Sequence, residues 1–159
     1  MTKIDAIGRK ILHELSRDGR ISNLELAERV GLSPSACLRR VQELERSGVI
    51  KGYRAVLDPA SMDIGFVAYV TVGLGSHTKS AQEAFERAVS RAPQVRECHN
   101  ITGEADFLLK VVAKDLDDYS RFVERVLRQL PGVLSIRSSI SLREIKAATG
   151  LPVLEILST

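Results

Sequence analysis

Two short amphipathic helices joined by a glycine turn constrain this chain more than any other feature. The stretch "SNLELAERVGLSPSACLRRVQELERSG" contains two helix starts, Ser22 at capping-box spacing and Ser33 followed by Pro34. Leu24, Ala27 and Val30 are expected on one face of the first helix. Gly31 suits the left-handed position past a helix end, and an amphipathic helix over residues 4–15 precedes the pair. The pattern predicts a helix-turn-helix motif at about residues 23–42.

The second helix of this pair has an apolar side and a basic side. Its apolar side comprises Cys37, Leu38, Val41 and Leu44. The other side starts with small residues, which allow close approach to a DNA groove, and continues with arginines that can bind guanine edges or phosphates. The predicted DNA-contacting residues are Asn23, Ser33, Pro34, Ser35, Ala36, Arg39, Arg40, Glu43, Arg46, Lys51 and Arg54. A solvated charged face is the alternative.

The two adjacent arginines are expected to differ in role. Arg39 points outward on the helical wheel and is the candidate for base or central contact. Arg40 is turned about 100 degrees away, so it is expected to hold phosphate.

The excess positive charge lies in the first third of the chain. Residues 1–58 hold 11 Lys and Arg against 8 Asp and Glu, whereas residues 59–159 hold 12 of each. A basic segment joined to a neutral remainder indicates a polyanion-binding module attached to a part with another role. The apolar runs are too short to cross a bilayer and the N-terminus has no signal-peptide core, so we expect a cytoplasmic protein without a membrane partner.

Residues 49–57, "VIKGYRAVL", allow two interpretations. They read as two extended pieces around Lys51 and Gly52, a small hairpin that would form the wing of a winged helix. A plain connecting strand is an equally good reading. The next stretch, "DPASMDIG" (58–65), has no periodicity and predicts a linker between a DNA-binding domain over residues 1–57 and a second domain over residues 66–159.

The second domain has the pattern of an α+β sheet domain. Strands are expected over residues 66–74, 95–102, 107–113 and 133–142, with one helix starting at the capping box of Ser80 and another capped by Asp115. This order predicts a ferredoxin-like βαββαβ fold with both helices on one face of the sheet. Dimerisation is expected to bury the other face through apolar residues of the first and last strands, Val67, Tyr69, Thr71, Ile140 and Leu142.

Several strings in this order resemble a known family over nearly the whole chain. They are "IDAIGRKILHELSRDGRISNLELAERVGLSPSACLRRVQELERSGVIKGYRAVLDP", "ECHNITGEADFLLKV", "LPGV" and "SSISLREIK". The family is that of the leucine-responsive and asparagine-synthetase regulators (Lrp/AsnC, or feast/famine, transcription regulators). The resemblance implies a DNA-binding domain tethered to a sensing domain called RAM, in a homodimer that commonly assembles into an octamer and responds to a free amino acid.

The resemblance also implies an effector site, near the turn between the second and third strands at an interface between subunits. Here the turn is Thr102, Gly103, Glu104, Ala105 and Asp106, and Ser138 and Ser139 of the last strand are further candidates. A glycine lets the backbone approach a ligand, turn N–H groups can bind a carboxylate, and an aspartate can accept an α-ammonium group. From the residues alone, a solvated acidic turn is the simpler reading. Leucine, methionine and other apolar or sulfur-containing effectors fit the family, and the sequence does not select among them.

Catalysis, a cofactor and a metal site are not expected. His13, His77 and His99 are scattered, and Cys37 and Cys98, which lack metal or redox spacing, are expected to be buried. One alternative is an architectural DNA-binding protein with no effector. A less favoured one is an enzyme resembling the sirohaem-type tetrapyrrole decarboxylases, whose two-domain architecture is similar. The basic helix argues against the enzyme, which would not need a groove-reading face.

Overall fold

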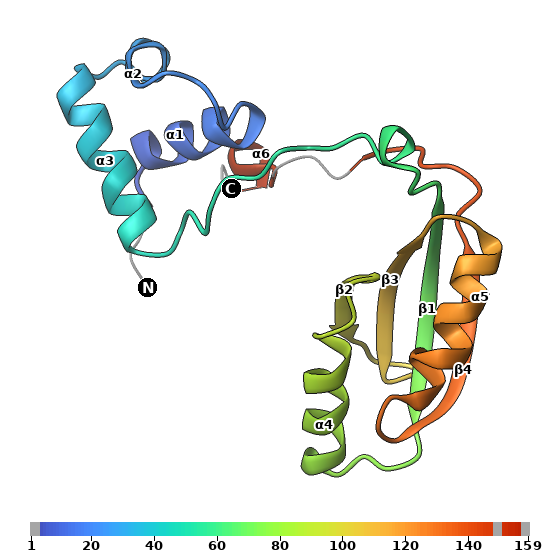
Figure 1. Ribbon diagram of the computed structural model, residues 1–159. Coiled ribbons are helices and arrows are strands. Elements are labelled where there is room, and N and C mark those ends of the chain that lie inside the picture. The colour runs from blue at the N-terminus through green and yellow to red at the C-terminus, as the bar shows by residue number, and fades with distance from the viewer. Residues whose placement is uncertain (1–3, 148–150, 157–159) are drawn as a thin grey trace. The chain divides into compact units, whose positions relative to one another are not determined.

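The computed structural model describes residues 4–147 and 151–156, which belong to two compact units. The first unit contains the chain up to Val56 together with the segment from Lys146, and the second unit is Leu57–Ile145. The sequence pattern predicts the tail as part of the second domain, whereas its described part groups with the first unit. Its short helix α6 (Val153–Ile156) contacts helix α1 (Figure 1). The predicted limits 1 and 159 lie outside the described residues.

Three helices make up most of the first unit: α1 (Ala6–Arg17), α2 (Asn23–Val30) and α3 (Pro34–Arg46). Each begins at a side chain that accepts a hydrogen bond from the first turn, namely Asp5, Ser22 and Ser33. Gly31 has the predicted left-handed conformation, with φ of 73°, and ends α2. The two helix starts and the glycine turn predicted from the sequence are therefore present, and α2 and α3 form the expected pair.

The core of the first unit is small, and it buries fewer side chains than the helical pattern predicts. It consists of Ile11, Leu26, Ala27, Val30 and Cys37. Leu24 and Leu38, which the pattern places on the buried faces, are instead 61% and 47% exposed. Nearby residues of the same helices, Leu26 in α2 and Cys37 in α3, are the ones that the core buries.

The segment after α3 forms no strand pairing, since the described chain has no strand between α3 and Phe66. Tyr53 anchors it within the first unit. The Tyr53 hydroxyl donates to a Glu45 carboxylate oxygen at 2.9 Å, and a Cβ built at Gly19 would lie 3.3 Å from the tyrosine ring. Of the two interpretations of residues 49–57, the plain connecting segment is the one that agrees with this backbone. A short 3₁₀ helix, η1 (Ala60–Met62), follows in the predicted linker.

The second unit contains a four-stranded antiparallel sheet in the order β2-β3-β1-β4. The strands are β1 (Phe66–Leu74), β2 (Val95–Asn100), β3 (Phe107–Ala113) and β4 (Val133–Ile140). The helices are α4 (Lys79–Val89), α5 (Leu116–Arg125) and the 3₁₀ turn η2 (Leu127–Gln129). This order and connectivity confirm the ferredoxin-like prediction. Helix α4 is capped by Thr78, whose hydroxyl accepts from the Ala81 N–H, and not by the predicted Ser80.

Helices α4 and α5 cover one face of this sheet (Figure 1), and alternate strand residues fill the core beneath them. The buried set includes Val70 and Val72 of β1, Leu109 of β3 and Phe85 of α4. Ile140 does not lie on the uncovered face as expected, because it pairs with Ala68, a residue of the buried face. The uncovered face of β1 and β3 presents Val67, Tyr69, Thr71, Leu108, Lys110 and Val112.

The outer strand β2 explains a second difference. Cys37 is buried as expected, but Cys98 is exposed, because β2 pairs with β3 on one side and has no neighbouring strand on the other within the described sheet. Cys98 pairs with Leu109 and His99 with Leu108, so the two neighbours face opposite ways as predicted.

The two ends of the sheet adjoin different segments of the chain. At one end β1 begins and β4 ends, and the Ser141 N–H donates to the Val67 carbonyl at 2.9 Å. The turn between β2 and β3 lies at the other end, beside the last residues of β1, since Phe107 pairs with Val72.

In the described part of the chain, we find no helix that is both long and apolar enough to span a membrane.

Candidate DNA-binding and effector sites

Helix α3 presents most of the predicted DNA-contacting side chains to solvent. Those that are exposed are Ser33, Pro34, Ser35, Arg39, Glu43 and Arg46 of this helix and its cap, with Lys51 and Arg54 of the following segment. Asn23, Ala36 and Arg40 are half-buried. The first turn of α3 carries small side chains on its outer side, which is the arrangement that lets a helix N-terminus approach base edges.

Two of the predicted contact residues also build the helix pair. The Ser33 hydroxyl accepts from the Ala36 N–H at 3.3 Å, and the Asn23 side chain donates to the Pro34 carbonyl at 2.9 Å. The second bond ties the start of α2 to the start of α3. These contacts hold the first turn of the recognition helix in a fixed position before any ligand is present.

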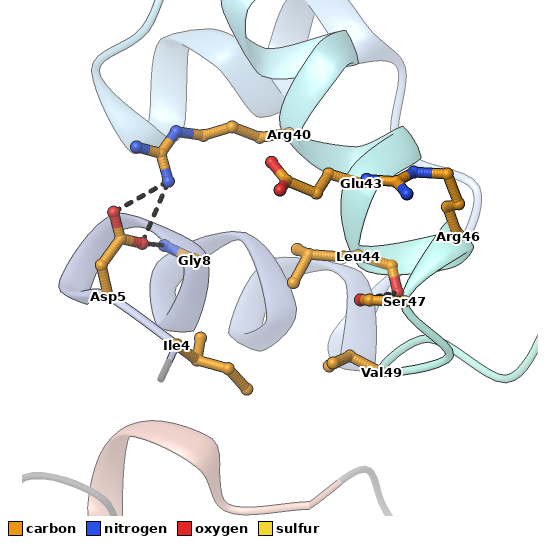
Figure 2. Close-up of a pocket in the computed structure, with 9 residues that line it drawn as sticks. All are labelled: Ile4, Asp5, Gly8, Arg40, Glu43, Leu44, Arg46, Ser47 and Val49. Atoms are coloured by element: carbon orange, nitrogen blue, oxygen red, sulfur yellow. Dashed lines mark hydrogen bonds and ion pairs between the residues drawn. The ribbon is translucent and has the colours of Figure 1, made fainter. Parts of the chain in front are cut away.

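Arg39 and Arg40 differ in the structure, as their positions on the wheel predict. Arg39 is exposed, and no ion pair to it is seen within the described residues. Arg40 reaches the start of α1, where its Nη1 lies 2.9 Å from Oδ2 and 3.0 Å from Oδ1 of Asp5 (Figure 2). The Gly8 N–H and the Arg40 guanidinium both stabilise the charged carboxylate and lower the pKa of Asp5 below its ordinary value of 3.8.

A second arginine joins α1 to α2 on the surface of the same unit. Arg29 donates to Glu14 at 2.7 Å and to Glu25 at 2.6 Å, and these bonds, that to Glu14 first, raise the pKa of Arg29. The Arg29–Glu25 pair has the i,i+4 spacing that sequence can suggest, whereas Arg29–Glu14 and Arg40–Asp5 join different helices. Sequence reasoning missed Asp5 because its pattern signals only a helix cap.

The predicted effector turn is held to the end of β1 by Asp106. Its N–H donates to the Val72 carbonyl at 3.0 Å, and its Oδ2 accepts from the Leu74 N–H at 2.7 Å. The other carboxylate oxygen, Oδ1, lies 3.2 Å from Nδ1 of His77. Thr102, Gly103 and Glu104 are exposed, and Gly103 has φ of 118°, which favours glycine. The carboxylate thus has a fixed position and one oxygen directed away from the sheet backbone.

Gly73, Ser135 and Arg137 adjoin this turn and were not predicted. A Cβ at Gly73 would lie 2.6 Å from the Ser135 hydroxyl oxygen and 4.0 Å from Oδ2 of Asp106, so glycine lets both side chains approach the strand. Arg137 Nη1 lies 3.7 Å from a Glu104 carboxylate oxygen. A glycine within the otherwise apolar "FVAYVTVGL" is the signal that could have identified this close approach.

The structure separates Ser138 from Ser139 and both from the turn. Ser138 pairs with Val70 and its hydroxyl is hydrogen-bonded to Tyr119 of α5, on the helix-covered face. Ser139 pairs with Tyr69 on the open face. Ser135 pairs with Gly73 beside the turn, so Ser139 lies four residues along β4, about 13 Å away at the rise of a strand. Within one chain, neither serine reaches the effector turn.

Comparisons with known proteins agree with this geometry. The model of a winged helix-turn-helix DNA-binding domain matches residues 4–51, and that of the Lrp/AsnC ligand-binding domain matches residues 67–151. The leucine-responsive regulatory protein of Escherichia coli is 41% identical over 148 residues, 93% of this chain and 90% of that protein. The chain belongs to the Lrp/AsnC family of transcriptional regulators.

Solved structures of Lrp/AsnC regulators share the whole architecture. A transcriptional regulator from Neisseria meningitidis in complex with L-methionine has a TM-score of 0.91 and 41% identity, covering 98% of this chain and 99% of its own. An AsnC family regulator from Agrobacterium tumefaciens has a TM-score of 0.89 and 33% identity, covering 96% and 99%. Helices α1–α3 lie within the DNA-binding match, and the turn at Asp106 lies within the ligand-binding match.

The Lrp/AsnC assignment gives the two units distinct roles. The first carries the DNA-binding domain of a transcriptional regulator and the second carries the ligand-binding domain. Within the described residues, no group of three or more His, Cys, Asp or Glu side chains is arranged to hold a metal ion.

Proposed function

We propose that this Lrp/AsnC regulator binds DNA through α3 and that a free amino acid, bound at the β2–β3 turn, changes its DNA affinity or its assembly. The observation that supports the effector-binding part of this proposal is the fixed carboxylate of Asp106. It accepts the Leu74 N–H at 2.7 Å through one oxygen and leaves the other directed toward His77 at 3.2 Å. A carboxylate held in this way can accept the α-ammonium group of an amino acid without first being ordered.

The same turn offers a partner for the α-carboxylate of the ligand. Residues 102–105 lie outside the strands, and their N–H groups make no hydrogen bond among those described for this unit. Successive free N–H groups in a turn form a binding site for anions. Gly103 exposes this backbone, because it has no side chain to shield it. An α-amino acid has both charges on neighbouring atoms, so one turn can bind both.

We further propose that a second copy of the chain completes this site. The turn lies on the surface of its unit, and the adjoining open face of the sheet presents Tyr69 41% exposed beside Val67 and Val112. An uncovered sheet face with apolar side chains favours a two-fold dimer. A dimer would also place Ser139 of the open face next to a neighbouring subunit. Through this contact Ser139 can contribute to the effector site of that subunit. Further assembly to an octamer, and a cytoplasmic location, are proposed from the family.

On the DNA side, Arg39 is proposed to contact bases and Arg40, Lys51 and Arg54 to contact phosphates. The exposed position of Arg39 on α3 supports the first assignment, and the location of the others beside the ends of α1 and α3 supports the second. Loss of a base-directed arginine should cost about 1–3 kcal/mol and relax sequence specificity, whereas loss of a phosphate-directed one should mainly reduce the salt dependence.

The effector is best identified by a thermal-shift screen of the full-length protein against the twenty amino acids. A ligand at about 100 times its dissociation constant stabilises the folded state by about 2.7 kcal/mol. We expect the response among apolar or sulfur-containing amino acids, with L-methionine tested first because a related regulator was solved with it. DNA binding, followed by fluorescence anisotropy on a fluorescent duplex, and sedimentation should then change when the same amino acid is added.

Gly73→Ala tests the location of the site. Its Cβ would lie 2.6 Å from the Ser135 hydroxyl oxygen and 4.0 Å from Oδ2 of Asp106, so Ser135 has to turn away beside this carboxylate. The amino-acid response should therefore weaken while DNA binding without effector is kept. Gly75→Ala is a matched control, because the nearest atom to its Cβ is 3.8 Å away. Asp106→Asn should abolish the response by removing the charge that binds the ammonium group. An unchanged response in both Gly73→Ala and Asp106→Asn would disprove the site.

The screen also separates this function from its alternatives. An architectural DNA-binding protein would bind DNA equally well in the presence of every amino acid. A sirohaem-type decarboxylase would give a Soret shift with one equivalent of added haem or sirohaem. We propose that the protein is not an enzyme and needs no cofactor, and the regulator family to which it belongs supports this.

A further inference from the structure

The ion pair between Asp5 and Arg40 links the start of α1 to the recognition helix. Arg40 donates from Nη1 to both carboxylate oxygens, at 3.0 and 2.9 Å, across 35 residues of sequence. Figure 2 shows the Arg40 side chain extended from α3 toward Asp5, with the carboxylate between the guanidinium and the Gly8 N–H. A carboxylate with two oxygens facing a guanidinium has the same recognition chemistry as a phosphate of DNA.

Asp5 is the fixed partner in this pair. Its Oδ1 accepts from the Gly8 N–H at 2.8 Å, as the cap of α1, and so the carboxylate is positioned by the helix backbone. Gly8 makes room for it, since a Cβ there would lie 3.0 Å from Oδ1 of Asp5 and 3.0 Å from Cγ2 of Ile4. The cap bond therefore restrains the carboxylate independently of Arg40, although the Asp5 side chain is itself 53% exposed.

Arg40 is the movable partner. Its side chain is 37% exposed, and it borders a cavity of about 390 Å³ between the start of α1 and the C-terminal half of α3 (Figure 2). The other charged residues that line this cavity are Glu43 and Arg46 of α3. The guanidinium can turn away from Asp5 without displacing packed side chains, because open space adjoins it.

We propose that Asp5 regulates the DNA affinity of this protein as an intramolecular competitor, whose carboxylate occupies Arg40 in place of a phosphate until correctly placed DNA displaces it. The proposal rests on the phosphate role proposed above for Arg40. On a poorly fitting duplex the Asp5–Arg40 pair persists and Arg40 adds little to binding. On a fitting duplex, a backbone phosphate takes over the guanidinium.

An exposed ion pair such as Asp5–Arg40 is weak, so a DNA phosphate can replace it. An arginine already neutralised by a carboxylate releases few counterions when it meets DNA. A free arginine that binds a phosphate changes the slope of log K against log salt concentration by about 0.9. Loss of the Asp5 charge should therefore raise the affinity for DNA by about two- to fivefold at low salt, and steepen the salt dependence on poorly fitting DNA by about one.

The test compares full-length wild type, Asp5→Asn, Arg40→Gln and the double variant. Asparagine keeps an oxygen that can accept the Gly8 N–H, so α1 remains capped while the charge is lost. Binding is measured by anisotropy at several salt concentrations, on a random-sequence duplex and on a duplex enriched from a random pool by the wild-type protein. Glu28→Gln, which removes one exposed carboxylate of α2, is the control for net charge.

We expect Asp5→Asn to strengthen binding to the enriched duplex at least as much as to the random one, because only wild type has to break the pair before Arg40 meets a phosphate. Both affinities should therefore rise, and their ratio should not fall. The gain in affinity should vanish in the Arg40→Gln background, and Glu28→Gln should give a smaller gain. Asp5→Asn should also lower the melting temperature of the DNA-binding unit slightly. Weaker stability with stronger non-specific binding separates this role from a merely structural one, which would weaken both.

The outcomes distinguish the two proposals. If Arg40→Gln binds both duplexes as wild type does, at every salt concentration, the phosphate role of Arg40 is wrong and the inference about Asp5 fails with it. If Arg40→Gln weakens binding but Asp5→Asn leaves the affinity for both duplexes unchanged or lowers it, the role of Asp5 alone is overturned. An equal gain of affinity in Glu28→Gln would also overturn it, because net charge would then explain the effect.

Discussion

The two units of this regulator are stabilised by different means. The sheet unit has a continuous core beneath α4 and α5, in which the rings of Phe85 and Phe107 lie with centroids 4.6 Å apart. The helix-turn-helix unit has a small core around Ile11 and Cys37, and its helices are further joined by surface caps and ion pairs such as Asp5–Arg40. The ligand-binding unit thus has the larger apolar core, whereas in the DNA-binding unit the contacts between helices include the ion pairs Arg29–Glu14 and Asp5–Arg40.

This difference has a functional meaning. Apolar packing responds little to salt or pH, whereas exposed ion pairs and helix caps are sensitive to both. In the unit that meets a polyanion, contacts between the helices therefore respond to charge. The sheet unit can keep its geometry while the ionic environment of the DNA-binding unit changes.

The largest expected effect is a loss of core packing in the sheet unit. Phe85→Ala removes a fully buried ring and should destabilise this unit by about 3–5 kcal/mol. Differential scanning calorimetry should show a lower melting temperature for the sheet unit, with the helix-turn-helix transition unchanged. Leu116→Ala, at a 57% exposed position of α5, should change little. Equal shifts of both transitions in Phe85→Ala would show that the units unfold together.

A medium effect is expected from a helix cap in the DNA-binding unit. Ser33→Ala removes the acceptor of the Ala36 N–H and should cost this unit about 0.5–2 kcal/mol. Ser35→Ala, two residues on, removes a hydroxyl that does not cap the helix, and should leave the unfolding free energy nearly unchanged. Urea unfolding monitored by circular dichroism measures both. Equal losses of unfolding free energy in Ser33→Ala and Ser35→Ala would show that the Ser33 cap does not stabilise the DNA-binding unit.

The smallest expected effect is the pH dependence of the Asp5 contacts. The pKa of Asp5 in the folded protein lies below its ordinary value of 3.8. The stability from this carboxylate is therefore complete at pH values above the unfolded pKa and is lost as the pH falls through the folded pKa. Asp5→Asn should be slightly less stable than wild type at pH 7, and the difference should shrink as the pH falls through the folded pKa of Asp5, below 3.8. A difference that grows as the pH falls from 7 into this range would contradict this cause.

Local signals in the sequence predicted the elements well. The caps at Ser22 and Ser33, the turn at Gly31 and the strand Phe66–Leu74 all depend on residues near one another in the chain. Such features need no knowledge of the rest of the fold. The ends of the last strand and of α5 were less accurate, because helix and strand ends depend on their tertiary neighbours.

Contacts between distant segments could not be predicted in the same way. Alternation shows that neighbouring strand residues face opposite sides, but only the register with Ala68 shows that Ile140 shares the helix-covered face, where it is 48% exposed. The pairing of Asp106 with His77 joins segments 29 residues apart, and that of Asp5 with Arg40 joins two helices. No short-range pattern encodes these distances. The return of the tail to the first unit likewise had no signal in its sequence.

The grouping of α6 with the DNA-binding unit has a consequence for protein engineering. The sheet unit is an insertion within the chain of the first unit, so exchanging the sensor of this regulator for another requires two junctions, near residues 57 and 145. The first junction precedes β1 and the second follows β4, and these neighbouring strands are joined by the Ser141–Val67 hydrogen bond. A replacement sensor therefore needs its own first and last strands side by side, and a chimaera with one junction would lack the tail of its DNA-binding unit.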